Sequence, residues 1–361
     1  MKFQPVFESK HERPYIIAGP CSAETEEQVM TTARALAKQN IDLYRAGIWK
    51  PRTAPGSFEG VGVEGLSWLK RVKKETGLKV TTEVAKTDHV FEALKAGIDV
   101  LWLGARTTVN PFAVQEVADA IKGVDIPILI KNPINPDFKL WVGAIKRIYN
   151  AGITKIGVIH RGFSYYGDTK YRNVPRWQIP IDLMREFPDL TFICDNSHIC
   201  GRRDILGEVA QKAMDLNFDG LMTETHPDPD NAWSDAKQQI TPEVFGDLVK
   251  SLVYRNPSST NRTFNATLDH LRHEIDEIDN EILNLLGKRM NIAGNIGQYK
   301  KDNNISILQS ARWSEILDAA VAKGAKKELS ETFISSFLKA VHQESINRQE
   351  TVMNSKGIIV K

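Results

Sequence analysis

The sequence predicts an α/β protein: a (β/α)8, or TIM, barrel followed by a small all-α domain of three helices. Short runs rich in β-branched residues recur in the first part of the chain, at 15–19, 42–48, 79–84, 100–105, 127–132, 155–162, 191–198 and 220–226. Segments with helical spacing lie between these runs, and several end at glycine, where helices commonly stop. Eight such units in roughly 250 residues match a (β/α)8 barrel in size and number.

The eight runs are nearly continuous in apolar character, which predicts parallel strands buried on both faces. The intervening segments include EEQVMTTARALAKQ, GLSWLKRVKKETG, DHVFEALKAG, FAVQEVADAIKG and LWVGAIKRIYNAG, and each shows helical periodicity. An open doubly wound sheet is the alternative fold. We find no glycine-rich dinucleotide motif between a strand and a helix, so the pattern favours the barrel.

The pattern changes after residue 253. We predict a barrel domain over 1–253, a polar linker over 254–264 and a helical domain over 265–361. The first long helix of that domain has an apolar seam with residues three and four apart: Leu268, Leu271, Ile275, Ile278, Ile282, Leu285, Ile292 and Ile296. Further helices are expected at about 311–322 and 331–353. Three helices are too thin to bury this seam, so we expect dimerisation or docking on the barrel.

Composition limits the class of partner. The 361 residues are 42% hydrophobic and 25% charged, with a formal net charge of +2. This balance does not favour nucleic acid or an anionic membrane as a partner, and no apolar run approaches the length of a membrane span. The N-terminus lacks the apolar stretch of a signal peptide. Three cysteines do not make a disulfide framework. We therefore expect a reduced, cytoplasmic protein.

Polar and charged residues follow the predicted strands, where (β/α)8 enzymes place their catalytic groups. Besides Glu83, five of these residues are cations: Lys50, Arg52, Arg106, Lys131 and Arg161. Any one of them could be a surface salt-bridge partner. Five at one barrel mouth are costly unless multiply charged anions fill the site, and arginine suits phosphate and carboxylate. The pattern predicts two phosphate-bearing substrates, or one phosphate and a carboxylate.

A second set combines a thiol, an imidazole and two carboxylates, contributed by Cys21, His198, Glu224 and Asp235. This mixture of soft and hard donors suits a divalent transition metal such as Mn, Fe, Co or Zn better than Mg or Ca. The spacing is long and non-local, so it is not specific by itself. The alternative is a buried, inert cysteine with a structural histidine and a hydrogen-bonded glutamate.

The motifs AGPCSAE, KPRT, TEV, GAR, HRG, DNSH and LMTETHP…SDA occur in this order over about 14–253. They resemble those of the type I-beta 3-deoxy-D-arabino-heptulosonate 7-phosphate (DAHP) synthases. The resemblance implies condensation of phosphoenolpyruvate with D-erythrose 4-phosphate, the first step of the shikimate pathway. It also implies one divalent metal ion, with Mn foremost and Fe, Co, Zn or Cd as alternatives.

The same resemblance implies individual roles. Cys21, His198, Glu224 and Asp235 would bind the metal. Arg106, Lys131 and Arg161 would hold the phosphate and carboxylate of phosphoenolpyruvate, with the catalytic Lys50 beside them. Arg52 and Thr53 of KPRT, helped by Ser197, would take the sugar phosphate. Separately from the resemblance, we hypothesise that Asp235 or Glu83 transfers protons in this reaction. Two departures affect loop detail only: GART replaces the family's GARN, and KPRTAPGSFEG replaces KPRTSPYSFQG.

A related family, the 3-deoxy-D-manno-octulosonate 8-phosphate synthases, shares the barrel, phosphoenolpyruvate and often the cysteine-containing metal site. Its members usually carry a KANRS-like segment where this chain has KPRT. The KPRT segment therefore favours the four-carbon sugar phosphate. In the alternative interpretation, an octulosonate synthase-like barrel would carry a helical domain that only binds an effector or dimerises.

In the helical domain, Arg289 lies on the apolar seam, where a charge is costly unless an anion meets it. Lys300 is about three turns further on and shares that face, whereas Arg272 is rotated from Arg289 by roughly 100°. Ser345 and Gln349 are four residues apart on the last helix. On pattern alone, a coiled dimerisation module with a polar layer remains an alternative.

Residues 265–355 also resemble the all-helical, AroQ-class chorismate mutases, in which a dimer builds two pockets and each takes an arginine from the partner. The matching positions are Arg272, Arg289, Lys300, Arg312, Ser345 and Gln349. Arg272 would be the arginine that each subunit contributes to its partner's pocket. Lys300 and Gln349 would form hydrogen bonds to the ether oxygen of chorismate. No cofactor is needed. Trp313 stands where the family has glutamate, so a weak or mainly regulatory mutase is expected.

Together these resemblances predict a bifunctional enzyme, a metal-dependent synthase joined to a chorismate mutase. The first step of the shikimate pathway and a later step would then be joined in one chain, which suggests feedback regulation. Prephenate or chorismate bound in the helical pocket would lower the synthase activity of the barrel. We expect a homo-oligomer that is at least a dimer through the helical domain.

Overall fold

The computed structural model describes residues 1–7, 14–51, 56, 58–256 and 258–354. Its contacts divide the chain into two compact units, Met1–Pro257 and Ser258–Lys361. In the first unit, eight parallel strands pair in sequence order and close into a barrel. They are β1 (Tyr15–Gly19), β2 (Leu43–Arg45), β3 (Val80–Val84), β4 (Val100–Leu103), β5 (Ile128–Lys131), β6 (Ile156–His160), β7 (Thr191–Asp195) and β8 (Gly220–Glu224). The predicted barrel is confirmed.

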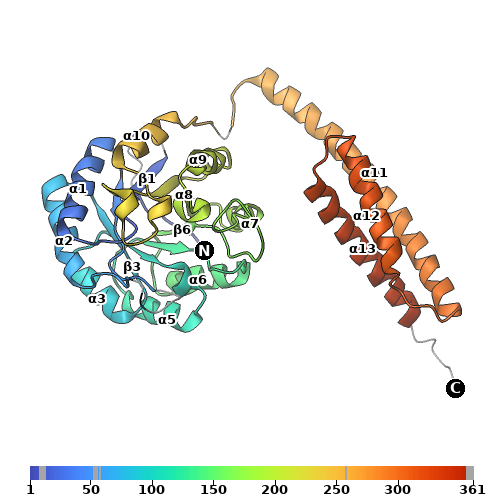
Figure 1. The fold of residues 1–361 in the computed structure, drawn as a ribbon, viewed down its shortest axis with the longest axis horizontal. Helices are drawn as coiled ribbons and strands as arrows, with labels where there is room; N and C mark the ends of the chain where they lie inside the picture. The colour runs from blue at the N-terminus through green and yellow to red at the C-terminus, as the bar shows by residue number, and fades with distance from the viewer. Residues whose placement is uncertain (8–13, 52–55, 57, 257, 355–361) are drawn as a thin grey trace. The chain divides into compact units, whose positions relative to one another are not determined.

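Helices surround these strands (Figure 1). The outer ring comprises α1 (Glu26–Leu36), α2 (Glu64–Thr76), α3 (Thr87–Lys95), α5 (Pro111–Ala120), α6 (Phe138–Asn150), α7 (Gln178–Glu186), α9 (Leu206–Asp215) and α10 (Pro242–Ser251). Shorter elements are α4 (Ala105–Thr108), α8 (Asn196–Cys200), η1 (Ala37–Gln39), η2 (Pro229–Asn231) and η3 (Ala236–Gln238). Asparagine or aspartate caps α5 and α6, since Asn110 and Asp137 accept hydrogen bonds from their first turns.

The strands carry two apolar layers because successive side chains point to opposite faces. Outward-facing residues pack against the helices in a large cluster. Inward-facing residues form a second cluster that fills the barrel and includes Val6 and Phe7 of the N-terminal segment. The inner cluster contains Leu43, Leu129, Ile159, Ile193 and Met222. Two residues further along the chain, the same alternation directs four strand-end residues and the residue that follows β6 toward the barrel axis: Arg45, Lys131, Asp195, Glu224 and Arg161.

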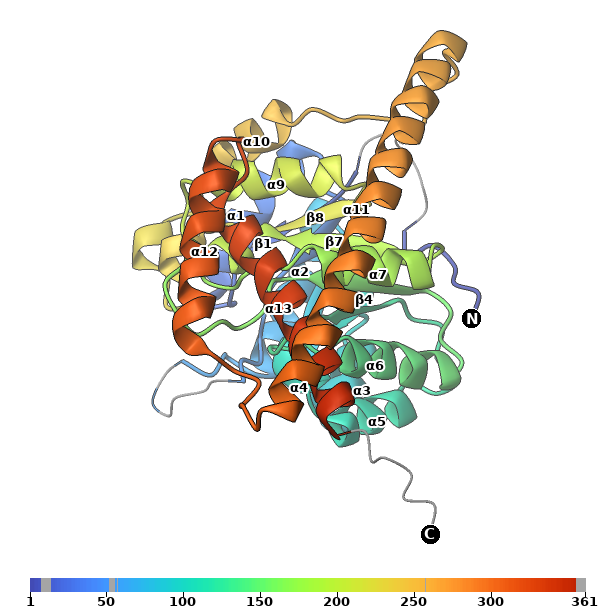
Figure 2. The same ribbon diagram turned by 90° about the vertical axis from the view of Figure 1, so that its right-hand side faces the viewer.

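The second unit contains α11 (Arg262–Asp302), α12 (Ser310–Ala325) and α13 (Glu331–Asn354). Helix α13 packs along α11, and α12 packs against α13 (Figure 1, Figure 2). Helix α11 begins inside the stretch predicted to be a linker, because Asn261 caps it: Asn261 Oδ1 accepts a hydrogen bond from the N–H of Phe264 (3.1 Å). Much of the predicted apolar seam is exposed, including Ile278 (56%) and Leu285 (63%).

All three cysteines, Cys21, Cys194 and Cys200, are buried and free. Among the residues that the structure describes, no helix combines the length and apolar character needed to cross a membrane.

Candidate functional sites in the barrel and the helical unit

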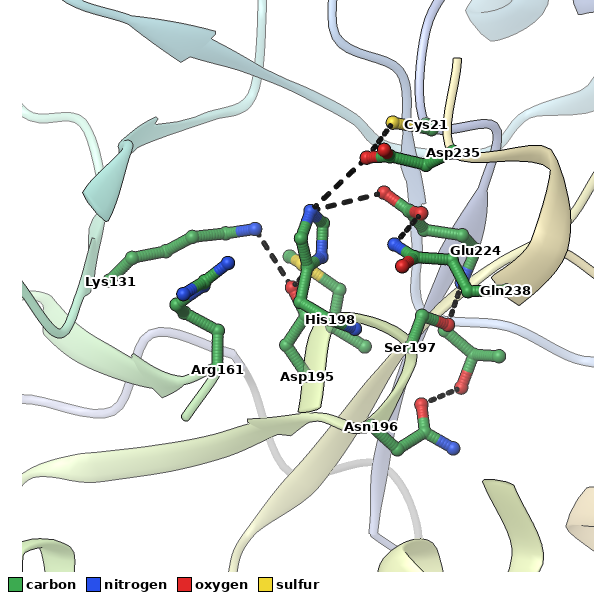
Figure 3. A network of polar contacts seen from close by, with 12 residues as sticks. Cys21, Lys131, Arg161, Asp195, Asn196, Ser197, His198, Glu224, Asp235 and Gln238 are labelled. Atoms are coloured by element: carbon green, nitrogen blue, oxygen red, sulfur yellow. Dashed lines mark hydrogen bonds and ion pairs between the residues drawn. The ribbon is translucent and has the colours of Figure 1, made fainter. Parts of the chain in front are cut away.

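Four predicted metal ligands converge at the barrel mouth (Figure 3). One ligand atom each from Cys21, Glu224 and Asp235 lies within 4.8 Å of the other two. Cys21 Sγ is 3.3 Å from Asp235 Oδ2. His198 Nε2 points into the same group, 3.7 Å from Glu224 Oε1 and 3.9 Å from Asp235 Oδ2. Residues more than 200 positions apart in the chain therefore share one small space.

Asp195 fixes the orientation of His198. Its Oδ1 accepts a hydrogen bond from the backbone N–H of His198 (3.1 Å), which caps the short helix α8. Its Oδ2 lies 2.8 Å from His198 Nδ1 and 2.8 Å from Lys131 Nζ. Burial alone would raise the pKa of Asp195, but His198 and Lys131 hold it well below its usual value. With its Nδ1 facing this carboxylate, His198 presents Nε2 to the ligand group, as metal-binding histidines commonly do.

Further side chains hold the two carboxylate ligands. Arg45, which is 1% exposed, lies 3.1 Å from Glu224 Oε1, and Gln238 donates to Glu224 Oε2 (2.7 Å). Arg172 forms an ion pair with Asp235 Oδ1 (2.9 Å). Asp235 itself adopts a left-handed backbone with φ of 51°, which is uncommon for a residue other than glycine. The positions of these carboxylates therefore depend on several separate chain segments.

The donor atoms present fit a divalent transition ion. One thiol sulfur, one imidazole nitrogen and carboxylate oxygens combine soft and hard ligands. Burial, followed by the negative charge of Glu224, raises the pKa of Cys21 to about 12 in the absence of a metal ion. Lys50 Nζ lies 3.0 Å from Cys21 Sγ and opposes that shift. A metal ion would replace the proton on this sulfur.

Two of the predicted anion-binding cations, Lys131 and Arg161, lie beside the ligand group. Figure 3 shows the ends of Lys131 and Arg161 on the side of His198 away from Cys21 and Asp235. Burial, together with the charges of Arg172 and Arg106, lowers the pKa of Arg161 to about 10, although Asp195 opposes the shift. Burial also lowers the pKa of Lys131. Crowded, buried cations of this kind are stabilised by an anionic ligand.

Other predicted residues take different positions. Lys50 lies against Cys21 and donates to its backbone carbonyl (3.0 Å). Glu83 is buried and accepts a hydrogen bond from Trp102 Nε1 (3.1 Å). Ser197, expected near the sugar phosphate, is fully buried, and its Oγ accepts a hydrogen bond from the N–H of Glu224 (2.9 Å). Arg52 and Thr53 lie outside the described residues.

Sequence reasoning missed Arg45, Asp195, Arg172 and Gln238. Two of them leave a signal in the sequence. Asp195 stands three residues before His198 at a strand end, which is the spacing of a helix cap. Arg45 is a cation in the middle of a short, mainly apolar run, and such a residue is rarely buried unless it is paired. Arg172 and Gln238 lie in irregular segments, and no local pattern distinguishes them.

The helical unit contains a cavity of about 340 Å³. Five of the six predicted mutase residues line it: Arg289, Lys300, Arg312, Ser345 and Gln349. Arg289 donates to Ser345 Oγ, and Gln349 Nε2 donates to the carbonyl of Ser345 (3.2 Å). Gln349 Oε1 is buried and has no hydrogen-bond partner among the residues described. The cavity thus combines cations with an unpaired amide oxygen.

Arg272 does not line this cavity. It precedes Arg289 by seventeen residues on α11, or about 25 Å at 1.5 Å per residue. Its side chain is 65% exposed and lies 3.4 Å from Asp269 Oδ1. One chain therefore assembles five of the six predicted residues and leaves Arg272 on the surface.

Trp313, which departs from the mutase pattern, also lines the cavity. Its ring stacks on that of His342, with centroids 4.0 Å apart and an interplanar angle of 22°. Burial and the nearby charge of Arg289 lower the pKa of His342, which favours its neutral imidazole. Two stacked aromatic rings therefore line the cavity at the position where the mutase pattern has a glutamate.

Comparisons with known proteins agree with the two predicted domains. A model of the DAHP synthetase I family matches residues 2–254, and one of chorismate mutase type II matches residues 271–350. The chain is 32% identical over 237 residues to the phospho-2-dehydro-3-deoxyheptonate aldolase of Thermotoga maritima, covering 66% of this chain and 68% of that protein. It is 29% identical over 265 residues to a 2-dehydro-3-deoxyphosphooctonate aldolase of Legionella pneumophila, covering 68% of this chain and 93% of that one.

Solved structures agree as well. The Thermotoga maritima DAHP synthase superposes with a TM-score of 0.60 at 30% identity, covering 66% of this chain and 67% of that one. A truncated form of the enzyme from the same organism gives the same TM-score at 26% identity, covering 69% and 90%. The family resemblances predicted from the sequence are confirmed. The chain belongs to the DAHP synthetase I family and, with its type II chorismate mutase domain, is a bifunctional enzyme of the shikimate pathway.

Proposed function

We propose that the barrel condenses phosphoenolpyruvate with D-erythrose 4-phosphate in a reaction that depends on a divalent metal, with manganese as the foremost candidate. The observation that carries this proposal is the convergence of Cys21, His198, Glu224 and Asp235 beside buried cations. These four residues would hold the ion. When bound, the ion would supply Lewis acidity toward the aldehyde oxygen of the sugar.

The remaining residues of the mouth bind and orient the substrates. Arg106, Lys131 and Arg161 hold the phosphate and carboxylate of phosphoenolpyruvate, and their charge balances the substrate's. The KPRT segment, through Arg52 and Thr53, takes the phosphate of the sugar. C3 of phosphoenolpyruvate forms a bond to the aldehyde carbon, water adds at C2, and inorganic phosphate leaves. Glu83 or Asp235 transfers the proton.

The test follows phosphoenolpyruvate loss with erythrose 4-phosphate and with arabinose 5-phosphate, each with and without a chelator. We expect turnover with erythrose 4-phosphate only, abolished by the chelator and restored by Mn²⁺. Chorismate consumption should continue in the chelator, which makes it a control on the same chain. Turnover with arabinose 5-phosphate alone would favour the octulosonate synthase, and chelator-resistant turnover would contradict metal dependence.

We further propose that the mutase pocket is completed by dimerisation, with Arg272 supplied by the second copy. The exposed apolar seam of α11 provides the contact surface, and Arg272 lies on that helix outside the cavity of its own chain. In the pocket, Arg289 and Arg272 grip the two carboxylates of chorismate, while Lys300 and Gln349 bond the ether oxygen. The rearrangement is pericyclic, so orientation and electrostatics supply the rate.

Finally, we propose that prephenate or chorismate in this pocket lowers the activity of the synthase. The fusion of an early and a later pathway step in one chain supports this regulation. In the full-length protein, Arg289→Ala should abolish inhibition of the synthase by prephenate while leaving its uninhibited rate unchanged. Lys288→Ala, which changes an exposed cation next to Arg289 that does not line the cavity, is the control. Unaltered inhibition in Arg289→Ala would contradict the idea.

A further inference from the structure

Two buried ionisable residues next to the metal ligands have no role in the proposed chemistry. Glu24 follows Cys21 by three residues, and His226 follows Glu224 by two. Glu24 is 6% exposed and His226 is 5% exposed. Burying a carboxylate is costly unless it is well paired, so the partners of Glu24 indicate what it does.

Both oxygens of Glu24 bind the segment that follows β8. Glu24 Oε1 accepts a hydrogen bond from the N–H of Trp233 (2.8 Å), and Oε2 lies 3.2 Å from His226 Nε2. The N–H of Asp228 donates to His226 Nδ1 (3.0 Å). Because Nδ1 accepts, the ring hydrogen must be on Nε2, and His226 donates to Glu24. The carboxylate therefore joins the β1–α1 loop to two points of the segment 225–240.

This segment carries Asp235, whose backbone is in the left-handed region with φ of 51°. Two further contacts fasten it to the residues around Cys21. Ser22 Oγ lies 2.6 Å from Ser234 Oγ, and the N–H of Cys21 donates to Gln239 Oε1 (3.0 Å). Such a backbone conformation persists only where the surroundings hold it. Within this set of contacts, those of Glu24 involve a buried carboxylate group, and each of its oxygens has a partner in the segment.

We propose that Glu24 and His226 are positioning residues: they hold the Asp235 segment against the Cys21 loop and so set the spacing of two ligands. The inference rests on the metal site proposed above. It implies that Glu24 controls metal affinity without touching the ion, as residues behind metal ligands do in other proteins.

The experiment measures the dissociation constant for Co²⁺ in the full-length protein by titrating the absorption of the cobalt–thiolate bond. Glu24→Ala should weaken binding by about 10- to 100-fold, the usual effect of removing such a support. Synthase activity should recover at saturating metal, and chorismate mutase activity should not change. Glu27→Ala removes an exposed carboxylate from the same turn of the chain and serves as the control.

Glu24→Gln tests the hydrogen bond with little change of shape. The amide oxygen can still accept from Trp233, but the amide N–H would face the N–H of His226. We expect a Co²⁺ affinity between those of wild type and Glu24→Ala, in a metal-free protein that still folds. If Glu24→Ala does not fold, the Co²⁺ affinity of Glu24→Gln tests the inference by itself.

Co²⁺ affinity within twofold of wild type in Glu24→Gln and in a folded Glu24→Ala would overturn the inference and leave the metal site intact. A wild-type protein that shows no cobalt–thiolate absorption would instead overturn the metal site itself, and the inference with it.

Discussion

The two sites of this enzyme differ in how much of each is assembled by one chain. At the barrel mouth, a single chain brings together four donor groups, together with the ion pairs and the hydrogen bond that hold them. In the helical unit, a single chain brings together five of six predicted residues, and the sixth, Arg272, lies exposed on α11. The barrel site can be assembled by one chain because closure of the barrel brings the ends of all eight strands around one axis.

Because the two sites are assembled differently, we expect the synthase and chorismate mutase activities to respond to different perturbations. The barrel site should be sensitive to the metal ion and to the loops that carry its ligands. The helical site should be sensitive to association between copies, because a single three-helix unit leaves both its apolar seam and Arg272 uncovered.

The largest expected effect concerns the shared mutase pocket. Arg272→Ala and Arg289→Ala should each lower chorismate mutase kcat/KM by about 100- to 1000-fold, as loss of a key charged donor does. Mixing the two inactive variants should restore about a quarter of wild-type activity, because half of randomly formed dimers have one intact pocket of two. Chorismate consumption after subunit exchange measures this recovery.

The matched control for this mixture is each variant exchanged with itself, which should stay inactive. If the mixture gains no activity although mixed dimers form, both arginines act within one chain. The comparison between the two sites would then fail.

A somewhat smaller effect is expected at the barrel. Cys21→Ser should weaken metal binding and lower synthase activity by about 100-fold, because a hydroxyl is a poor substitute for the thiolate ligand. Mutase activity should persist. Cys200→Ser alters a buried cysteine outside the ligand group and is the control. Full, chelator-sensitive synthase activity in Cys21→Ser would return Cys21 to a packing role.

The smallest effect concerns the wall of the helical cavity. Trp313→Glu should raise mutase kcat/KM by about tenfold, since a hydrogen bond between the substrate hydroxyl and a carboxylate is worth about 1.5 kcal/mol or more. The gain should appear in chorismate consumption and leave the synthase unchanged. An unchanged or lower kcat/KM would show that the stack of Trp313 on His342 already does the work of the missing carboxylate.

Much of the fold was predictable because it depends on local periodicity. Each apolar run around β1 to β8 became a strand, although runs such as 191–198 were predicted too long, since Asn196 already begins helix α8. The aspartate before it caps that helix, and capping competes with strand extension over one or two residues. Similarly, the cap at Asn261 moved the start of α11 into the predicted linker.

By itself, the sequence determined the strand and helix periodicity, the donors at the strand ends and the family motifs, all of which are properties of neighbouring residues. The tertiary structure decided which further groups meet these donors. It paired Arg45 with Glu224, Arg172 with Asp235, and Glu24 with His226 across 202 positions. Local patterns do not identify the partners in these contacts, because the partners meet through barrel closure and loop paths, once the chain has folded around one axis.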